Sequence, residues 1–370
     1  DTMKILFLAD ANSIHTIKWV ESLHKHKLNI LVFSLFKPTD DVVQKYQNWG
    51  IPLISADLQS KIRNLRVPNI SKLNYLTAFR LLKKTMNAFE PDIIHAHYAS
   101  SYGVLGYLSK FKPFILSVWG SDVYDFPQKN QLNKWLLKKV IHSASSVCST
   151  SEAMKAVIAT QFDRFDVKVI PFGVDASVFA PASESPQQFT VGTIKSIEAH
   201  NGIDCLLDAA NIIINEYHNT YIHFLIVGQG SLLGEMKQKT TDLGLDNYVK
   251  FAGYIPHEKI VEFHQKLSVF ISVSTRESFG VAVLEAAACG VPAITSNVGG
   301  LPEVNQNNYT GYVIPPNDPE KLANSIFKLF KDKNLKDQME KNARDRVAKQ
   351  FNWNKNVIQM VNVYQENEFL

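Results

Sequence analysis

The chain has 370 residues, of which 45% are hydrophobic and 20% are charged, and this composition excludes the disordered, collagenous and coiled-coil classes. At roughly 100–200 residues per domain, the length predicts two domains. The formal net charge of +4 is too small to predict a nucleic-acid-binding protein.

No apolar run approaches the ~20 residues of a membrane span, and the first run, residues 5–9, is too short for the core of a signal peptide. The three cysteines lie far apart and form no CxxC pair, which is typical of a reducing compartment. We therefore expect a cytoplasmic protein.

The first half of the chain repeatedly places a short apolar run before a helical pattern. Near-continuous apolar strands joined by helices predict a parallel sheet that is covered on both faces. The expected strands are 5–9, 30–35, 93–95, 114–118, 147–149 and 167–170, and the expected helices are 16–26, 102–109, 132–141 and 152–160.

Turn residues between 171 and 186 interrupt this pattern, and the alternation of strands and helices then begins again. We predict an α/β protein of two Rossmann-like doubly wound domains, 1–175 and 176–352, that face each other across a cleft. The aromatic-rich end of the chain, 353–370, is expected to be a helix that crosses back to complete the first domain. The second domain should contain strands 189–193, 222–227, 249–252, 269–272 and 293–295, and helices 203–213, 281–288 and 319–331.

Two glutamates frame the start of one predicted helix in the second domain. Glu277 lies in the loop after strand 269–272, and Glu285 lies one turn into the helix that begins near Val281. Gly280 lets the backbone come close to a ligand, and the free N–H groups that follow form an anion site on the helix dipole. Carboxylates accept hydrogen bonds from paired hydroxyls, as on a hexose or a ribose. Taken alone, the pattern fits two solvated glutamates around a helix cap equally well.

Three further loops are expected at the same edge of this sheet, since each follows a predicted strand. They contain Gly228 and Gly230, Gly299 and Gly300, and Lys195, which supplies a cation where a diphosphate would need one. The convergence of four such loops on one edge is more specific than any of them alone.

With these loops in place, the chain resembles the retaining GT-B glycosyltransferases of family 4. The hallmark of that family is Glu, seven residues, Glu, here Glu277 and Glu285 within Ser-x-x-Glu-x-Phe-Gly. The resemblance covers nearly the whole chain, and its other motifs are Ala11-Asn-Ser-Ile-His15-Thr, Asp92-Ile-Ile-His-Ala-His97, Trp119-Gly-Ser-Asp122, Val169-Ile-Pro-Phe-Gly-Val-Asp175 and Val298-Gly-Gly-Leu-Pro-Glu303.

The resemblance implies transfer of a hexose-type sugar from a nucleotide diphosphate, most often UDP, with retention at the anomeric carbon and without a metal ion or other cofactor. It implies that Glu285 holds the donor ribose, that Glu277 contacts the donor sugar as a catalytic residue, and that backbone amides hold the diphosphate. We find no convincing Asp-x-Asp for a metal, and Asp40-Asp41 is expected in a polar surface loop. The expected donor-binding residues are Lys195, His200, Gly228, Tyr254, Ile255, Ser278, Phe279, Gly280, Val281 and Glu285.

The sequence departs from the family in the loop after strand 189–193. The family places an Arg and a Lys where this chain has Ser196 and Asn201, and cations stand one residue earlier, at Lys195 and His200. We favour Lys195 as the cation for the diphosphate, and Arg276 is an alternative.

A second departure lies in the first domain, where many members carry a histidine at the position of Trp119. Tryptophan cannot accept a proton, so Asp122 and His97 are candidates to assist the acceptor hydroxyl, unless the departing phosphate takes the proton itself. His97 fits a core histidine equally well. On the acceptor side of the cleft we expect Asn12, Ser13, His15, Trp119 and Gly120, with loops 38–49 and 57–71 forming the pocket.

The charge is unevenly divided between the halves. Residues 1–180 carry 22 Lys and Arg against 14 Asp and Glu, a net +8, and residues 181–370 carry 17 against 21, a net −4. In the basic half, Leu132, Trp135, Leu136 and Val140 have helical spacing and are flanked by lysines. This pattern fits a helix on an anionic bilayer surface or a packed helix with a solvated lysine edge.

Lipid-linked acceptors are common among members of the family, so the acceptor is expected to be a glycan, a lipid-linked sugar or a small molecule. The expected role is surface polysaccharide or glycoconjugate biosynthesis, with peripheral association at the inner face of the cell membrane. Two alternatives stay open. One is a nucleotide-sugar 2-epimerase-like isomerase, which would give a sugar isomer still attached to its nucleotide. The other is a nucleotide-sugar-binding protein without activity, which would not hydrolyse its donor.

Overall fold

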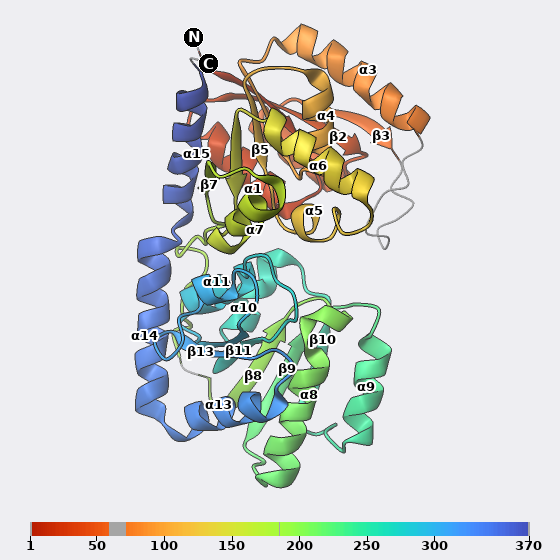
Figure 1. Cartoon of the computed structure of the whole chain (residues 1–370). Coiled ribbons are helices and arrows are strands. Elements are labelled where there is room, and N and C mark those ends of the chain that lie inside the picture. Colours follow the sequence, from red (N-terminus) through yellow and green to blue (C-terminus); the bar gives the residue numbers. More distant parts are fainter. Residues whose placement is uncertain (1, 59–71, 185, 369–370) are drawn as a thin grey trace. The chain divides into compact units, whose positions relative to one another are not determined.

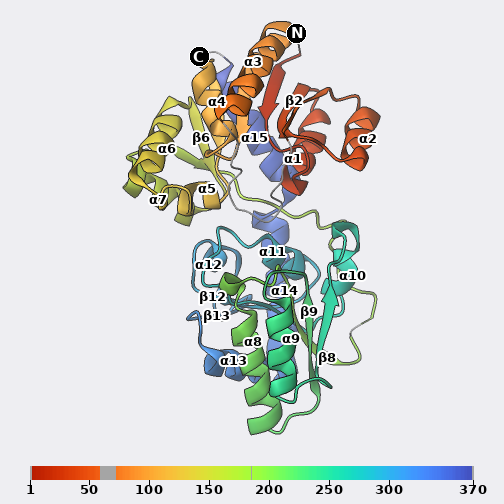
Figure 2. The ribbon, with the colours of Figure 1, turned by 90° about the vertical axis from the view of Figure 1, so that its right-hand side faces the viewer.

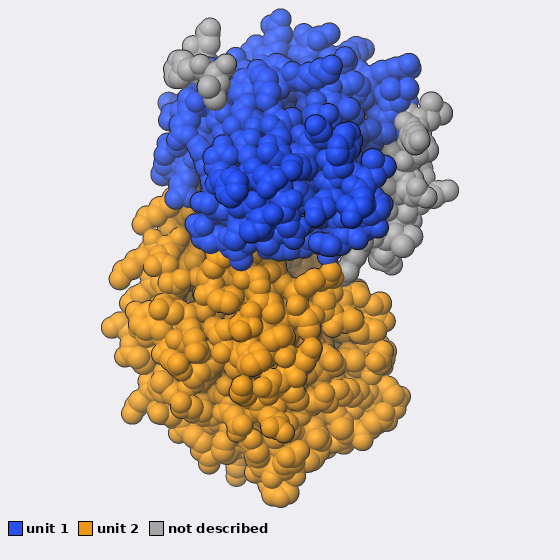
Figure 3. All heavy atoms as spheres, viewed as in Figure 1, with its two compact units in different colours: residues 1–170, 357–370 blue, residues 171–356 orange. Residues whose placement is uncertain are grey.

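The computed structural model describes residues 2–58, 72–184 and 186–368. The chain forms two compact units (Figure 3), unit 1 from Asp1–Ile170 with Val357–Leu370 and unit 2 from Pro171–Asn356. The first division lies a few residues before the predicted boundary at 175, and the second lies a few residues after the predicted boundary at 352.

Unit 1 is built on a seven-stranded parallel sheet in the order β3-β2-β1-β4-β5-β6-β7. Helices α3, α4 and α6 lie on one face of this sheet, and α1 and α15 lie on the other (Figure 1). The strands are β1 (Lys4–Leu8), β2 (Asn29–Phe36), β3 (Leu53–Leu58), β4 (Ile93–His97), β5 (Phe114–Ser117), β6 (Ser146–Ser149) and β7 (Val167–Val169). The helices are α1 (Ile14–His24), α2 (Asp40–Trp49), α3 (Lys72–Phe89), α4 (Tyr102–Ser109), α5 (Ser121–Tyr124), α6 (Gln131–Ser143), α7 (Glu152–Phe162) and α15 (Trp353–Asn367).

Both faces of the sheet are buried at the inner strands β1 and β2, which is why these two strands are nearly continuous apolar runs. Leu6 and Leu8 of β1 pack into the core under α3, α4 and α6, while the ring of Phe7 faces the opposite layer and contacts His95 and His97. Fully burying one such side chain contributes about 1.5–3 kcal/mol.

The prediction of a polar loop at 38–49 is wrong, because residues 40–49 form α2. Asp40 and Asp41 occupy the first turn of this helix, where the helix dipole favours carboxylates. Val42 and Tyr46, one turn apart, are buried, and Gly50 ends the helix with a φ of 67°. The second predicted acceptor loop is 57–71, and its residues 59–71 lie outside the described residues.

Unit 2 contains a six-stranded parallel sheet in the order β10-β9-β8-β11-β12-β13. Helices α8 and α9 lie side by side in this unit, and α14 packs against α11 (Figure 2). The strands are β8 (Phe189–Ile194), β9 (Ile222–Val227), β10 (Val249–Gly253), β11 (Val269–Ser272), β12 (Ala293–Ser296) and β13 (Gly311–Ile314). The helices are α8 (Ile203–Asn211), α9 (Leu233–Asp242), α10 (Ile260–His264), α11 (Val281–Ala288), α12 (Leu301–Val304), α13 (Pro319–Lys331) and α14 (Lys333–Gln350).

The prediction of two Rossmann-like doubly wound domains is confirmed by these two sheets. The helix predicted at the end of the chain is α15, which begins in unit 2 and belongs to unit 1 from Val357 onward. Within unit 1 the hydroxyl of Tyr364 lies 2.7 Å from Nδ1 of His95. No helix in the described part of the chain is both long and apolar enough to cross a membrane.

Candidate active site

The carboxyl ends of the strands in unit 2 bring the four predicted loops into contact. Gly228, after β9, has a φ of 142°, and a Cβ atom there would lie 1.8 Å from the carbonyl oxygen of Lys195, after β8. A Cβ atom on Gly299, after β12, would lie 1.7 Å from the carbonyl oxygen of Glu277, after β11. These two glycines are required because the loops pack backbone against backbone.

Lys195 and Glu277 form an ion pair where the loops after β8 and β11 meet. Nζ of Lys195 lies 2.5 Å from Oε2 of Glu277 and also donates to the hydroxyl of Ser274 at 2.7 Å. The two charged side chains are only 10% and 20% exposed. The second oxygen of Glu277 accepts a hydrogen bond from the N–H of Ser278 at 3.1 Å. Ser274 belongs to the Ser-x-x-Glu motif, but its contact with Lys195 was not predicted.

Ser196 and Asn201, the two neutral residues where the resemblance implies cations, bond to each other. The amide Nδ2 of Asn201 donates to the hydroxyl of Ser196 at 2.8 Å and to its carbonyl oxygen at 2.7 Å. His200, next to Asn201, is half-buried, and its carbonyl oxygen accepts a hydrogen bond from the N–H of Thr275 at 2.9 Å. The diphosphate role of His200 stays a prediction.

Helix α11 begins at Val281 directly after Gly280, whose φ of 104° suits a glycine at the N-cap position. The ring of Phe279 is buried and packs against Phe172 and Phe351. Because this ring is buried, the side chain of Phe279 supports the turn before α11, and the predicted contact of the 279–281 amides with a diphosphate stays a prediction.

Glu285 lies on α11 with its carboxylate between two histidines, and the whole residue is only 7% exposed. Its Oε1 lies 3.3 Å from Nε2 of His257, and its Oε2 lies 3.6 Å from Nε2 of His264. Burial favours the neutral acid, but the two imidazoles outweigh burial and lower the pKa of Glu285 to about 2.

Sequence reasoning missed both histidines. His257 follows β10 by a few residues, at the same sheet edge as the other loops, and that position could have indicated a site residue. Tyr254 and Ile255, which were predicted to bind the donor, lie in the same segment, and the ring of Tyr254 is exposed.

The carboxyl edge of the sheet in unit 1 brings together the predicted acceptor residues. Asn12, after β1, donates from Nδ2 to the carbonyl oxygen of Lys37 and accepts from the N–H of Thr39. It therefore fixes the loop after β2, while Ser13 stands at the N-cap position of α1.

The aromatic side chains His15, Trp119 and His97 form a contiguous group at this edge. The ring of Trp119 lies 4.6 Å from that of His97 and 5.7 Å from that of His15. His97 is buried, and its Nδ1 has no hydrogen-bond partner among the described residues. Burial, together with His95 and His15, holds the pKa of His97 well below its ordinary value, so its imidazole is neutral.

Asp122 is fully buried, and its carboxylate binds the backbone of two loops. It accepts hydrogen bonds from the N–H groups of Ala99 at 2.8 Å, Gly120 at 2.8 Å and Trp119 at 3.2 Å. Burial raises its pKa, against the effect of these hydrogen bonds. This geometry favours a structural role for Asp122 over the proton transfer that we considered from the sequence.

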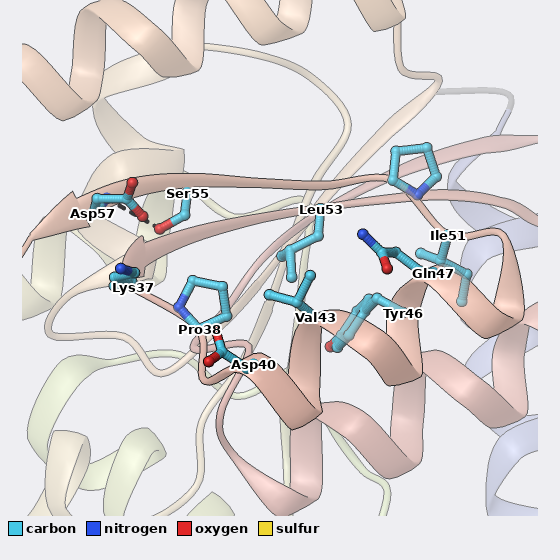
Figure 4. Close-up of a pocket in the computed structure, with 11 residues that line it drawn as sticks. Lys37, Pro38, Asp40, Val43, Tyr46, Gln47, Ile51, Leu53, Ser55 and Asp57 are labelled. Carbon is cyan, nitrogen blue, oxygen red and sulfur yellow. Dashed lines mark hydrogen bonds between the residues drawn. The ribbon is translucent and has the colours of Figure 1, made fainter.

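A hollow of about 430 Å³ lies between α2 and β3 in unit 1. One face of α2 and alternate residues of β3 line it (Figure 4), with Tyr46, Val43 and Leu53 on its apolar side and Lys37 and Asp57 on its polar side. The predicted acceptor segment 38–49 therefore contributes to a hollow, but through a helix and a strand in place of a loop.

Helix α6 exposes two large apolar side chains among lysines. Leu132 is 69% and Trp135 55% exposed, and Nζ of Lys139 lies 5.8 Å from the ring centre of Trp135. Lys138 instead pairs with Asp163.

The two parallel-sheet units have the architecture of the GT-B fold. A cation, two carboxylates and glycine loops lie at the carboxyl edge of the second sheet. Residues 177–346 match the family model described as Glycosyl transferases group 1, and residues 4–151 match that described as Glycosyl transferase 4-like. The two matches lie one in each unit and together support a glycosyltransferase.

The chain is 26% identical over 308 residues to an uncharacterised glycosyltransferase of Methanocaldococcus jannaschii, covering 81% of this chain and 84% of that protein. It is 25% identical over 331 residues to the Escherichia coli UDP-Gal:alpha-D-GlcNAc-diphosphoundecaprenol alpha-1,3-galactosyltransferase, covering 83% and 84%. Among solved structures, HepE of Anabaena in complex with UDP matches with a TM-score of 0.82 at 21% identity, covering 98% of this chain and 100% of that one. This last similarity confirms the GT-B fold.

Proposed function

We propose that this protein is a retaining, metal-independent hexosyltransferase that uses a UDP-sugar. The observation that carries the proposal is the buried contact of Lys195 with Glu277, beside the amide groups that begin α11. A cation and free backbone N–H groups at one edge suit a leaving diphosphate, and the nearby carboxylates suit sugar hydroxyls. The match of residues 177–346 to the group 1 family model supports the same reaction.

In the proposed reaction, the bond between the anomeric carbon and the β-phosphate oxygen breaks, and a bond to the acceptor oxygen forms on the same face. Lys195 uses two of its three N–H donors on Glu277 and Ser274, which leaves one for a phosphate oxygen. The acceptor proton passes to the departing diphosphate. This route requires no base in unit 1, where Trp119 cannot accept a proton and the carboxylate of Asp122 already accepts three backbone N–H groups.

UDP is the nucleotide that we favour because HepE of Anabaena was solved with UDP and the Escherichia coli relative is named for UDP-Gal. We infer a lipid-linked acceptor in surface glycan assembly, because that relative is named for a diphosphoundecaprenol acceptor. The exposed Leu132 and Trp135 of α6, with Lys134 and Lys139 beside them, suit contact with an anionic bilayer.

A thermal-shift screen with UDP, GDP, ADP and their sugar conjugates tests the donor proposal. We expect one nucleotide to raise the melting temperature, and we expect Glu285→Ala to lose that shift. If no nucleotide shifts the melting temperature of the folded protein, the donor proposal fails. Slow release of UDP from the chosen donor distinguishes a transferase from a protein that only binds, and a new isomer still attached to UDP would indicate an epimerase.

Sedimentation with vesicles tests the membrane proposal. The protein should bind vesicles that contain anionic lipid more tightly than neutral vesicles, and Trp135→Ser should weaken this binding. Tyr221→Ser, which changes an exposed aromatic side chain of unit 2, is the matched control and should leave binding unchanged. Equal binding to both kinds of vesicle would contradict the proposal.

A further inference from the structure

Both oxygens of the Glu285 carboxylate face histidines that come from neighbouring segments of unit 2. His257 lies just before α10 and approaches Oε1 at 3.3 Å, while His264 ends α10 and approaches Oε2 at 3.6 Å. Both imidazole rings also contact Phe179, at centroid distances of 6.1 and 6.2 Å. The carboxylate is therefore enclosed on two sides by imidazoles that one aromatic ring supports.

His264 is an unusual choice for a purely hydrophobic position. It is fully buried between the rings of Phe179 and Phe270, and neither of its nitrogens has a hydrogen-bond partner among the described residues. An unsatisfied buried imidazole destabilises a core, whereas a phenylalanine would fill the same space without that cost. Its Nε2 is only slightly beyond hydrogen-bonding distance from Glu285, and hydrogen bonds at active sites often shorten when the substrate binds.

The carboxylate of Glu285 has acceptor positions for a diol beyond those that the two histidines face. An ionised carboxylate has about four acceptor positions. Two imidazole N–H groups would occupy one position on each oxygen, and the remaining two positions, again one on each oxygen, match two neighbouring hydroxyls. A carboxylate that is held in this way loses little rotational freedom when a diol binds.

We propose that His257 and His264 are positioning residues that orient Glu285 toward the cis-diol of the donor ribose, and thereby set the preference for ribonucleotides over deoxyribonucleotides. This inference rests on the proposed function in one respect, that Glu285 binds the ribose. The low pKa of Glu285 agrees with it, because the carboxylate then stays ionised and acts only as an acceptor.

The ratio of the dissociation constants for 2′-deoxy-UDP and UDP, measured by calorimetry, tests the inference. The wild-type protein should prefer UDP. His257→Ala and His264→Phe should each lower the preference about three- to ten-fold, since they remove an N–H donor. His264→Gln keeps a donor and should restore most of the preference. His223→Gln, at the opposite end of the sheet on β9, is the matched control and should leave the ratio unchanged.

Different results would overturn different claims. If the wild-type protein prefers UDP and both His257→Ala and His264→Phe keep the full ratio, the positioning role is wrong and the ribose role of Glu285 stands. If the wild-type protein shows no preference, or binds no UDP while folded, Glu285 does not bind the ribose, and the inference fails with the proposed function. His257 is partly exposed, so its replacement should not unfold the protein, and a general loss of packing would weaken both nucleotides equally.

Discussion

Replacing Lys195 by methionine tests the ion pair on which the proposed function depends. The change keeps an unbranched side chain that is one atom shorter and removes the charge that faces Glu277 at 2.5 Å. Glu277 would then keep the N–H of Ser278 as a partner, with its carboxylate only 20% exposed. Because the carboxylate would be mostly buried without its counter-charge, we expect both stability and catalysis to fall.

The expected magnitudes follow from the burial of the pair. Breaking a fully buried pair costs about 3–5 kcal/mol, and the partial exposure of Glu277 reduces this to about 2 kcal/mol. For a unit of this size, about 2 kcal/mol corresponds to a fall of roughly 4–8 °C in melting temperature. Loss of one cation from the diphosphate should lower kcat about 10²–10³-fold.

A double-mutant cycle with Glu277→Gln separates the pair from other effects of the substitutions. Unfolding free energies of Lys195→Met, Glu277→Gln and the double variant should reveal a coupling of about 2 kcal/mol. Lys250→Met, an exposed lysine on β10 of the same unit, should change neither stability nor kcat. Strict additivity of the two substitutions, or a kcat of Lys195→Met equal to that of the wild type, would refute the reasoning.

Three further predictions concern stability. Burial lowers the pKa of His95 to about 3 from an ordinary 6.5. The free energy of unfolding should therefore fall by up to about 5 kcal/mol as the pH falls from 6.5 to 3. His95→Gln should flatten this pH dependence in urea titrations, and an unchanged pH dependence would contradict the prediction. Gly228→Ala should destabilise the protein by at least ~3 kcal/mol because of the clash with the Lys195 carbonyl, while Gly234→Ala in α9, with open space around it, should be neutral or stabilising in the same titration. Asp122→Asn should lower the unfolding free energy by about 1–3 kcal/mol and leave kcat within a few-fold; a thousand-fold loss of kcat in a fully folded variant would instead make Asp122 catalytic.

The sequence predicts those parts of the fold where burial leaves a regular pattern. The strands at the centre of each sheet, such as β1 and β11, are apolar on both faces and were found within a residue or two. Helix α2 was missed because its two acidic residues suggest a loop, and only Val42 and Tyr46 mark its buried side. Strand β13 was not predicted, because it has only four residues and begins with Gly311, so its apolar run is too short to be distinctive.

For the site, parallel topology explains what could be predicted. Carboxyl ends of parallel strands share one edge, so Lys195 and Glu277 could be expected near each other although 82 residues separate them. The contacts of Glu285 with His257 and His264 could not be expected in the same way. They depend on how α10 packs against α11, and no periodicity in the sequence reports that packing.

The shift of the cation by one residue after β8 has a physical consequence. β8 ends at Ile194 and the chain bends at Lys195, so residues 195 and 196 direct their side chains to different partners. Here Lys195 points to Glu277, while Ser196 is exposed and bonds to Asn201. The neutral pair thus fixes the loop at the two positions where the resemblance implies cations, and the positive charge reaches Glu277 from the neighbouring residue. The absence of the expected Arg and Lys therefore does not count against the proposed diphosphate site, because Lys195 places a cation beside the first glutamate of the motif.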